Sequence, residues 1–187
     1  MTEPHIAPEP LAHLEWRAHD EGDTAAVAQA LAAALHADVA LADALLTLRG
    51  DLGAGKTTFV RHLLRALGVT GRIKSPTYAL VEPYSLTLGA QRQPWAAWHA
   101  DLYRFGDPRE WEDAGLRELF ARPGLKLVEW PERARGMLPL PDLDIALGAD
   151  ADGDAEAARR LDLRAFSPLG AALLRAMPAP ISRRNAT

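Results

Sequence analysis

The chain has 187 residues, no cysteine, and 21 Lys and Arg against 25 Asp and Glu, for a formal net charge of −4. A length of this order fits one compact domain. The lack of cysteine excludes disulfides, thiolate metal sites and a cysteine nucleophile. Chains that bind nucleic acid unaided are usually basic, so the acidic charge argues against direct binding of RNA or DNA.

The N-terminal segment is predicted to be a disordered lead-in over residues 1–12, because it carries three prolines and little periodicity. It lacks the basic stretch and apolar run of a signal peptide. The most apolar stretch, residues 25–48, is interrupted by polar and charged side chains, which argues against a membrane span. We therefore expect a cytoplasmic protein with no membrane partner.

The first predicted helix covers residues 24–35 (TAAVAQALAAAL), with Asp23 as its N-cap. Val27, Leu31 and Leu35 recur at helical spacing and form one apolar stripe. A short apolar strand, a glycine-rich loop and a second helix follow. The strand covers residues 45–48, the loop residues 50–55 and the helix residues 57–67, with Gly68 as its C-cap.

The second half of the chain predicts β-hairpins and short helices. Residues 78–84 and 95–103 read as a hairpin with a long polar loop. The remaining predicted elements are helix 108–120, strand 125–130, a second hairpin of strands 143–147 and 160–165 around the acidic loop 150–156, and helix 169–177. Residues 178–187 are predicted to be a disordered tail.

The glycine-rich loop carries the strongest chemical signal. The segment Gly50–Thr57 (GDLGAGKT) satisfies G-x-x-x-x-G-K-[ST]. Glycines let the backbone approach a triphosphate, and the helix N-terminus adds positive charge. Lys56 would reach the β- and γ-phosphates, and the Thr57 hydroxyl would ligate Mg²⁺. The alternative is a glycine turn that merely joins two elements, but the preceding strand and following helix favour the nucleotide site.

The predicted fold is therefore α/β, a P-loop NTPase-like mixed sheet flanked by helices, in a single domain over residues 13–177. The predicted nucleotide contacts along the loop and first helical turn are Asp51, Leu52, Gly53, Ala54, Gly55, Lys56, Thr57 and Thr58. The predicted cofactors are ATP and Mg²⁺.

Two acidic residues are candidates for the remaining chemistry. Mg²⁺ at such a site needs a second protein group, and Glu129 ends the apolar run 125–129. A surface glutamate beside a proline turn is the alternative. Asp101 shares one strand face with His99 and Tyr103. It is a candidate to orient the attacking water or to hold Mg²⁺ through water, while His99 is interpreted as structural because no other His lies at ligand-like spacing.

The base specificity follows by elimination. Guanine-specific proteins read the base with an Asn-Lys-x-Asp segment, and the single asparagine of this chain is Asn185 in the tail. Guanine-nucleotide specificity is therefore not expected, and adenine is favoured. Trp130 is a candidate to stack on the base, with packing at the proline turn as the alternative.

Four blocks in order resemble the TsaE (YjeE) family, the ATPase component of bacterial tRNA threonylcarbamoyladenosine synthesis. They are RGDLGAGKTTFVRHLLRALG (49–68), KSPTYALVEPY (74–84), WHADLYRFGDPREWEDAGL (98–116) and LVEWPERARGMLP (127–139). By position, the resemblance implies phosphate and magnesium roles for Lys56 and Thr57, a magnesium role for Glu129, and a catalytic role for Asp101.

Further roles rest on the resemblance alone. Thr77, in the segment 75–77, matches a switch-like loop on the γ-phosphate side and is a candidate catalytic sensor. Trp130 matches a tryptophan beside the nucleotide, and Thr24 is similar to a threonine near the adenine. The resemblance further implies weak ATP hydrolysis alone. It implies that the protein acts on a complex of TsaB and TsaD, which modifies adenosine at position 37 of tRNA. The protein would therefore contact tRNA only indirectly, through that complex.

Two other function classes stay open from the residues. A small-molecule kinase would use the same loop with an arginine-bearing lid, for which Arg133 and Arg135 are the clustered candidates. A non-catalytic nucleotide sensor would bind ATP without turnover, and the presence of Asp101 and Glu129 argues against it.

Overall fold

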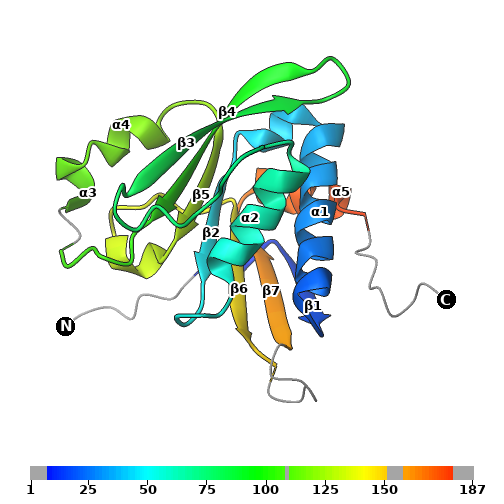
Figure 1. The fold of residues 1–187 in the computed structure, drawn as a ribbon, viewed down its shortest axis with the longest axis horizontal. Coiled ribbons are helices and arrows are strands. Elements are labelled where there is room, and N and C mark those ends of the chain that lie inside the picture. The colour runs from blue at the N-terminus through cyan, green and yellow to red at the C-terminus, as the bar shows by residue number, and fades with distance from the viewer. Residues whose placement is uncertain (1–7, 108–109, 151–157, 179–187) are drawn as a thin grey trace.

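The computed structural model describes residues 8–107, 110–150 and 158–178, which fold around one mixed sheet of seven strands in the order β1-β7-β6-β2-β5-β4-β3 (Figure 1). The strands are β1 Ala12–Ala18, β2 Leu45–Arg49, β3 Val81–Leu88, β4 Gln93–Asp101, β5 Leu125–Glu129, β6 Leu143–Ala149 and β7 Arg159–Ala165. The helices are α1 Glu21–Ala37, α2 Lys56–Ala66, α3 Glu110–Asp113, α4 Leu116–Phe120 and α5 Pro168–Ala176, with 3-10 turns η1 Val39–Ala42 and η2 Pro131–Ala134.

The centre of the sheet is parallel and both edges are antiparallel. Strands β6, β2, β5 and β4 run parallel, while β1 and β7 on one side and β3 on the other pair antiparallel. The central strands β2 and β5 are buried on both faces apart from Arg49, as parallel strands usually are. The carboxyl ends of β2, β4 and β5 consequently meet at one edge, where ligands bind in such sheets.

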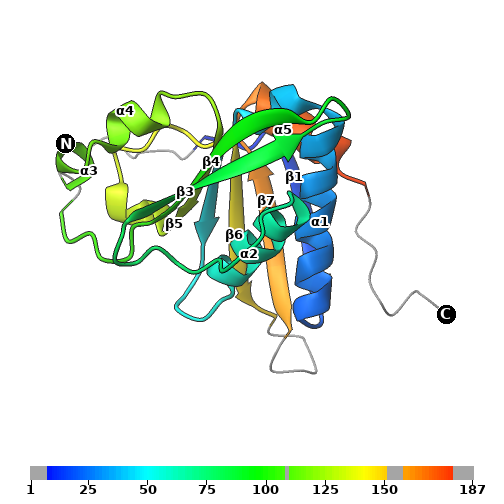
Figure 2. The ribbon, with the colours of Figure 1, turned by 45° about the horizontal axis from the view of Figure 1, so that its top comes forward.

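Helices cover the two faces of the sheet unequally. Helices α1 and α2 lie side by side against one face (Figures 1 and 2), and α5 packs beside α1, β1 and β7. Alternation along the strands separates two cores: Leu46 and Leu127 pack on the α1–α2 side, whereas Leu45 and Val128 pack on the opposite side with α3, α4 and η2. No helix in the described residues is long and apolar enough to cross a membrane.

Both predicted hairpins form. The strands β3 and β4 pair from Val81 opposite Ala100 to Leu88 opposite Gln93, so the connection is short and the expected long loop is wrong. Gly89 at positive φ (+72°) lets the chain turn there, and a Cβ on it would lie 2.9 Å from Val39 Cγ2. The strands β6 and β7 form the second hairpin, and residues 151–157 of its predicted acidic loop lie outside the described residues.

Two expected helices differ in the structure. Helix α1 begins at Glu21, because the side chain of Asp20 accepts a hydrogen bond from the Asp23 N–H at 2.9 Å. Asp23, the predicted N-cap, instead lies in the first turn and accepts from the N–H of His19, the residue before the N-cap, at 3.0 Å. The single helix predicted over 108–120 is two short helices, since Gly115 adopts φ +66° between them.

Strand β1 is an element that the sequence did not predict. Its side chains alternate between exposed and half-buried, and it pairs antiparallel with β7. The Leu11 N–H extends this ladder by donating to the Ala165 carbonyl at 2.8 Å. Residues 1–7 and 179–187, most of the expected lead-in and tail, lie outside the described residues.

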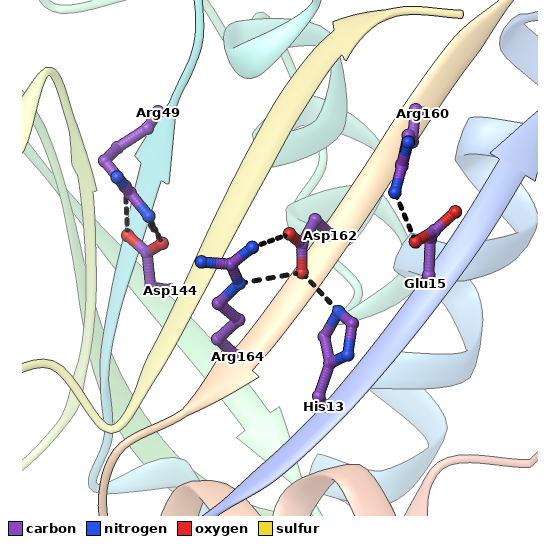
Figure 3. Close-up of polar contacts among 7 residues, drawn as sticks. All are labelled: His13, Glu15, Arg49, Asp144, Arg160, Asp162 and Arg164. Atoms are coloured by element: carbon purple, nitrogen blue, oxygen red, sulfur yellow. Dashed lines mark hydrogen bonds and ion pairs between the residues drawn. The ribbon is translucent and has the colours of Figure 1, made fainter. Parts of the chain in front are cut away.

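The face of β1, β7, β6 and β2 that points away from α1 and α2 carries charged side chains in place of a helix (Figure 3). We call it the charged sheet face, and its drawn members are His13, Glu15, Arg49, Asp144, Arg160, Asp162 and Arg164. Asp144 pairs with Arg49, Asp162 with Arg164 and His13, and Glu15 with Arg160. Ion pairs between neighbouring strands, and one within β7, thus satisfy a sheet surface that no helix of the described residues covers.

Candidate functional site

The glycine-rich loop joins β2 to α2 and has the backbone that the motif requires. Gly50, Gly53 and Gly55 all have positive φ, at +140°, +82° and +103°. A Cβ on Gly50 would lie 2.1 Å from the Leu147 carbonyl oxygen, so no other residue fits there. Gly55 caps α2 without a side-chain hydrogen bond, which leaves the first backbone N–H groups of the helix available to an anion.

Lys56 begins α2 and is held in the loop. Its Nζ donates to the carbonyls of Gly50 at 2.6 Å and Asp51 at 2.9 Å, and lies 3.7 Å from the ring centroid of Trp130. The side chain is 5 % exposed. Burial lowers the pKa of Lys56 below its ordinary value, against the opposing charge of nearby carboxylates, Glu129 first. The amine is therefore desolvated and placed beside acidic groups.

Thr57, Glu129 and His99 form a connected chain of hydrogen bonds. The Thr57 hydroxyl lies 2.9 Å from each carboxylate oxygen of Glu129. The Oε1 atom of Glu129 also lies 2.8 Å from Nε2 of His99. Glu129 is 2 % exposed and His99 is fully buried. The strand end thus places one carboxylate directly against the hydroxyl at the start of α2.

Asp101 ends β4 directly beside Glu129, because the two residues are register partners of the parallel pair β4–β5. Its carboxylate accepts from the hydroxyls of Ser75 and Thr77, the latter at 2.9 Å, and from the Tyr103 N–H at 3.0 Å. Asp101 is 4 % exposed. Two buried carboxylates therefore lie side by side at the ends of neighbouring strands.

A cavity of about 360 Å³ lies over these groups. Its lining residues are Leu52, Gly53, Gly55, Lys56, Thr57, Thr58, Ser75, Thr77, Asp101, Tyr103, Glu129 and Trp130. The predicted phosphate, magnesium and catalytic residues are thus brought to one cavity. Tyr103, which the sequence placed on the Asp101 face without a role, forms a wall with Trp130 at 5.0 Å between ring centroids.

Three predicted nucleotide contacts do not line the cavity. Asp51 contributes its carbonyl to Lys56, and Ala54 is buried in the loop. Thr24 is buried in the first turn of α1, where its hydroxyl contacts the Asp20 carbonyl at 3.4 Å. Trp130 lines the cavity but covers the Lys56 amine, which places its indole beside the lysine of the glycine-rich loop.

The oxygen donors of the site suit Mg²⁺ better than a cation that needs a full protein cage. Mg²⁺ takes one or two protein oxygens and completes its shell with water and phosphate. The Thr57 hydroxyl and the Glu129 carboxylate supply that number. Throughout the part of the chain that the structure describes, no group of three or more His, Cys, Asp or Glu side chains converges as a metal cage.

A parallel sheet, a glycine loop between β2 and α2, and acidic side chains at the adjoining strand ends define a P-loop-type α/β protein. A family model described as threonylcarbamoyl adenosine biosynthesis protein TsaE matches residues 18–160. The chain belongs to the TsaE family.

Individual relatives agree with this assignment. The protein named tRNA threonylcarbamoyladenosine biosynthesis protein TsaE of Haemophilus influenzae is 41 % identical over 136 residues, covering 73 % of this chain and 77 % of the relative. Its namesake in Bacillus subtilis is 37 % identical over 150 residues, covering 78 % and 84 %. The crystal structure of Bacillus subtilis YdiB superposes with a TM-score of 0.66 at 29 % identity, covering 88 % of this chain and 93 % of that one. The predicted family and fold class are confirmed.

Proposed function

We propose that this chain is a cytoplasmic Mg²⁺-dependent P-loop ATPase that supports formation of threonylcarbamoyladenosine in tRNA by acting on the TsaB–TsaD complex. Membership of the TsaE family and the names of the relatives support the pathway. The single observation that carries the ATPase part is the contact between Thr57 at the start of α2 and Glu129 at the end of β5, beside the amine of Lys56.

Each residue has a role that its environment supports. Lys56 and the N–H groups of the loop bind phosphate oxygens, while Thr57 and Glu129 hold Mg²⁺. When bound, Mg²⁺ neutralises negative charge on the phosphates. Asp101 faces the same cavity and is fixed by Ser75 and Thr77. Its carboxylate is placed to accept a proton from water or to orient that water.

The partners are proposed from the family resemblance. TsaB and TsaD would receive the effect of ATP binding or hydrolysis, and tRNA would be met through them. The net charge of −4 supports an indirect encounter, because a surface that holds RNA unaided needs a basic excess. Thr24 stays a proposed contact near the adenine, and Trp130 stays a proposed contact beside the nucleotide.

The test is ATP turnover by the purified chain, alone and then with TsaB and TsaD. We expect slow turnover that rises when the complex is added, together with multiple turnovers of tRNA modification. Thr57→Ala and Glu129→Ala should each weaken the Mg²⁺-dependent part of triphosphate binding, since each removes one of the two oxygen donors. Arg164→Ala, on the charged sheet face, serves as the matched control and should behave like the parent.

Two results would contradict the proposal. Turnover that ignores TsaB and TsaD but rises with a small phosphoryl acceptor would make the chain a kinase. Binding of ATP with unchanged Mg²⁺ dependence in both Thr57→Ala and Glu129→Ala would remove the magnesium assignment.

A further inference from the structure

His99 is a buried titratable side chain to which the proposed chemistry gives no role. It lies on β4, is 0 % exposed, and faces the α1–α2 side of the sheet together with Asp101. Its strand neighbours across the sheet are Glu82 on β3 and Leu127 on β5. The sequence favours a structural interpretation, in which the ring only fills space in the core.

The hydrogen bonds of the ring argue for a more specific role. Nε2 lies 2.8 Å from Oε1 of Glu129, whereas Nδ1 is buried without a hydrogen-bond partner in the described residues. A carboxylate only accepts, so Nε2 is assigned as the donor nitrogen of this pair. All the polar interaction of this ring is thus directed at Glu129.

The contacts of Glu129 show what this bond fixes. Its carboxylate can rotate about the terminal side-chain torsion, which is broad for glutamate. Thr57 alone would not fix that rotation, because its hydroxyl is equidistant, at 2.9 Å, from both oxygens. The bond from His99 selects Oε1 as its acceptor, which determines how the carboxylate faces the start of α2.

We propose that His99 is a positioning residue, whose Nε2–H holds the Glu129 carboxylate in the orientation that binds Mg²⁺ together with Thr57. This inference rests on the proposed function, because it assigns His99 a task in the same magnesium site. Hydrogen bonds to a metal-binding carboxylate typically change metal affinity about 10- to 100-fold. His99 itself binds neither metal nor nucleotide.

The test compares variants that keep or move the donor. His99→Gln places an amide N–H near the position of Nε2, whereas His99→Asn places it near Nδ1, too short to reach Glu129. The readout is the Mg²⁺ concentration that half-saturates triphosphate binding, measured by calorimetry, beside ADP binding without Mg²⁺. We expect a rise of about 10- to 100-fold for His99→Asn and less than about threefold for His99→Gln, with Mg²⁺-free ADP binding unchanged in both.

His62→Asn is the matched control, because the chain offers a second His–Glu pair of similar length on the surface. Nε2 of His62 lies 2.9 Å from Glu21 Oε1, on helices α2 and α1. This variant should keep the parental Mg²⁺ midpoint. Thermal melting of each variant reports whether it is folded, and the Gln–Asn comparison removes effects common to any loss of the imidazole ring.

The possible results distinguish failure of the role of His99 from failure of the proposed Mg²⁺-dependent function. A parent whose triphosphate binding does not depend on Mg²⁺ overturns the proposed function and the role of His99 with it. A Mg²⁺-dependent parent, with His99→Asn and His99→Gln at the same midpoint, overturns the positioning role alone. A raised midpoint in His99→Asn with rescue in His99→Gln supports it, since a space-filling histidine would not distinguish the two amides.

Discussion

Acidic side chains occupy two regions of the same sheet and are paired in different ways. On the charged sheet face, Asp144 and Asp162 accept hydrogen bonds from arginines (Figure 3). At the strand ends, Asp101 and Glu129 accept from hydroxyls, a backbone N–H and an imidazole. We call Asp101 and Glu129 the strand-end carboxylates. In the described residues, no Lys or Arg forms a hydrogen bond or ion pair with either of them.

The difference distinguishes charge used for stability from charge reserved for a ligand. A carboxylate paired with arginine is neutralised inside the protein and contributes to folding. Two buried carboxylates that lie side by side, with no lysine or arginine in hydrogen-bond contact in the described residues, are placed so that a bound cation would offset the repulsion between them. Substitutions in the two regions should therefore have opposite consequences for stability and activity.

The largest effect is expected for Lys56→Ala, because Lys56 is the cation that lines the cavity beside the strand-end carboxylates. Its loss removes the charge that meets the β- and γ-phosphates. We expect triphosphate binding to become too weak to measure and turnover to fall about 100-fold or more. Calorimetry and phosphate release measure the two quantities, and parental binding by Lys56→Ala would contradict the assignment.

Asp101→Asn should separate catalysis from both binding and stability. It removes the proton-accepting charge, so hydrolysis should fall about 100-fold or more while triphosphate affinity stays within about threefold. It also removes one of two like charges facing each other across paired strands. The free energy of unfolding without ligand should therefore rise by about 0.5–1 kcal/mol. Normal turnover in this variant would refute a catalytic role, and a clear loss of stability would refute the contrast between the regions.

Much of the site is local and was predicted from the sequence for that reason. The apolar run of β2, the glycines and the helix formers of α2 lie within about twenty residues of each other, and each has a recognisable pattern. Glu129 was predicted because the apolar run 125–129 ends there, and Asp101 because it shares a strand face with His99 and Tyr103 and matches the family resemblance. Parallel strand ends meet at one sheet edge, so the two carboxylates could be expected in one place.

The features that were missed depend on pairing between distant segments. Strand β1 alternates charged and apolar residues and is stabilised by β7, more than 140 residues away along the chain. The bond between His99 and Glu129 requires the β4–β5 register, which the sequence does not contain. Asp20 and Asp23 are both acceptable N-caps by composition, and only the geometry of α1 selects Asp20.

Asp144→Asn tests the other side of the comparison. Asp144 is 4 % exposed, accepts from the Thr47 hydroxyl at 2.7 Å, and pairs with Arg49, whose pKa its hydrogen bond raises. Loss of the charge-assisted bonds should reduce the free energy of unfolding by about 2 kcal/mol, with turnover within about twofold of the parent. Urea denaturation and phosphate release at neutral pH measure both. A variant that loses turnover at unchanged stability would place Asp144 functionally with the strand-end carboxylates.

Smaller effects are expected for Asp162→Asn, for which pH gives the signature, and the smallest for Glu15→Gln. Burial alone would raise the pKa of Asp162, but Arg164 and His13 bring it below the ordinary value. When the pKa of a carboxyl group is lower in the folded than in the unfolded protein, its charge stabilises the fold at pH values above the unfolded pKa of about 3.9. That stabilisation is lost as the pH falls through the folded pKa. The parent should therefore exceed Asp162→Asn by about 1 kcal/mol from pH 7 to pH 5, with the gap closing below about pH 4. Glu15→Gln, whose partner Arg160 is half exposed, should cost less than about 0.5 kcal/mol in the same urea series. The contradicting result is a difference in the free energy of unfolding between the parent and Asp162→Asn that is undiminished at about pH 3. Packing of the side chain, and not its charge, would then stabilise this face of the sheet. The contrast with Asp101 and Glu129 would no longer be electrostatic.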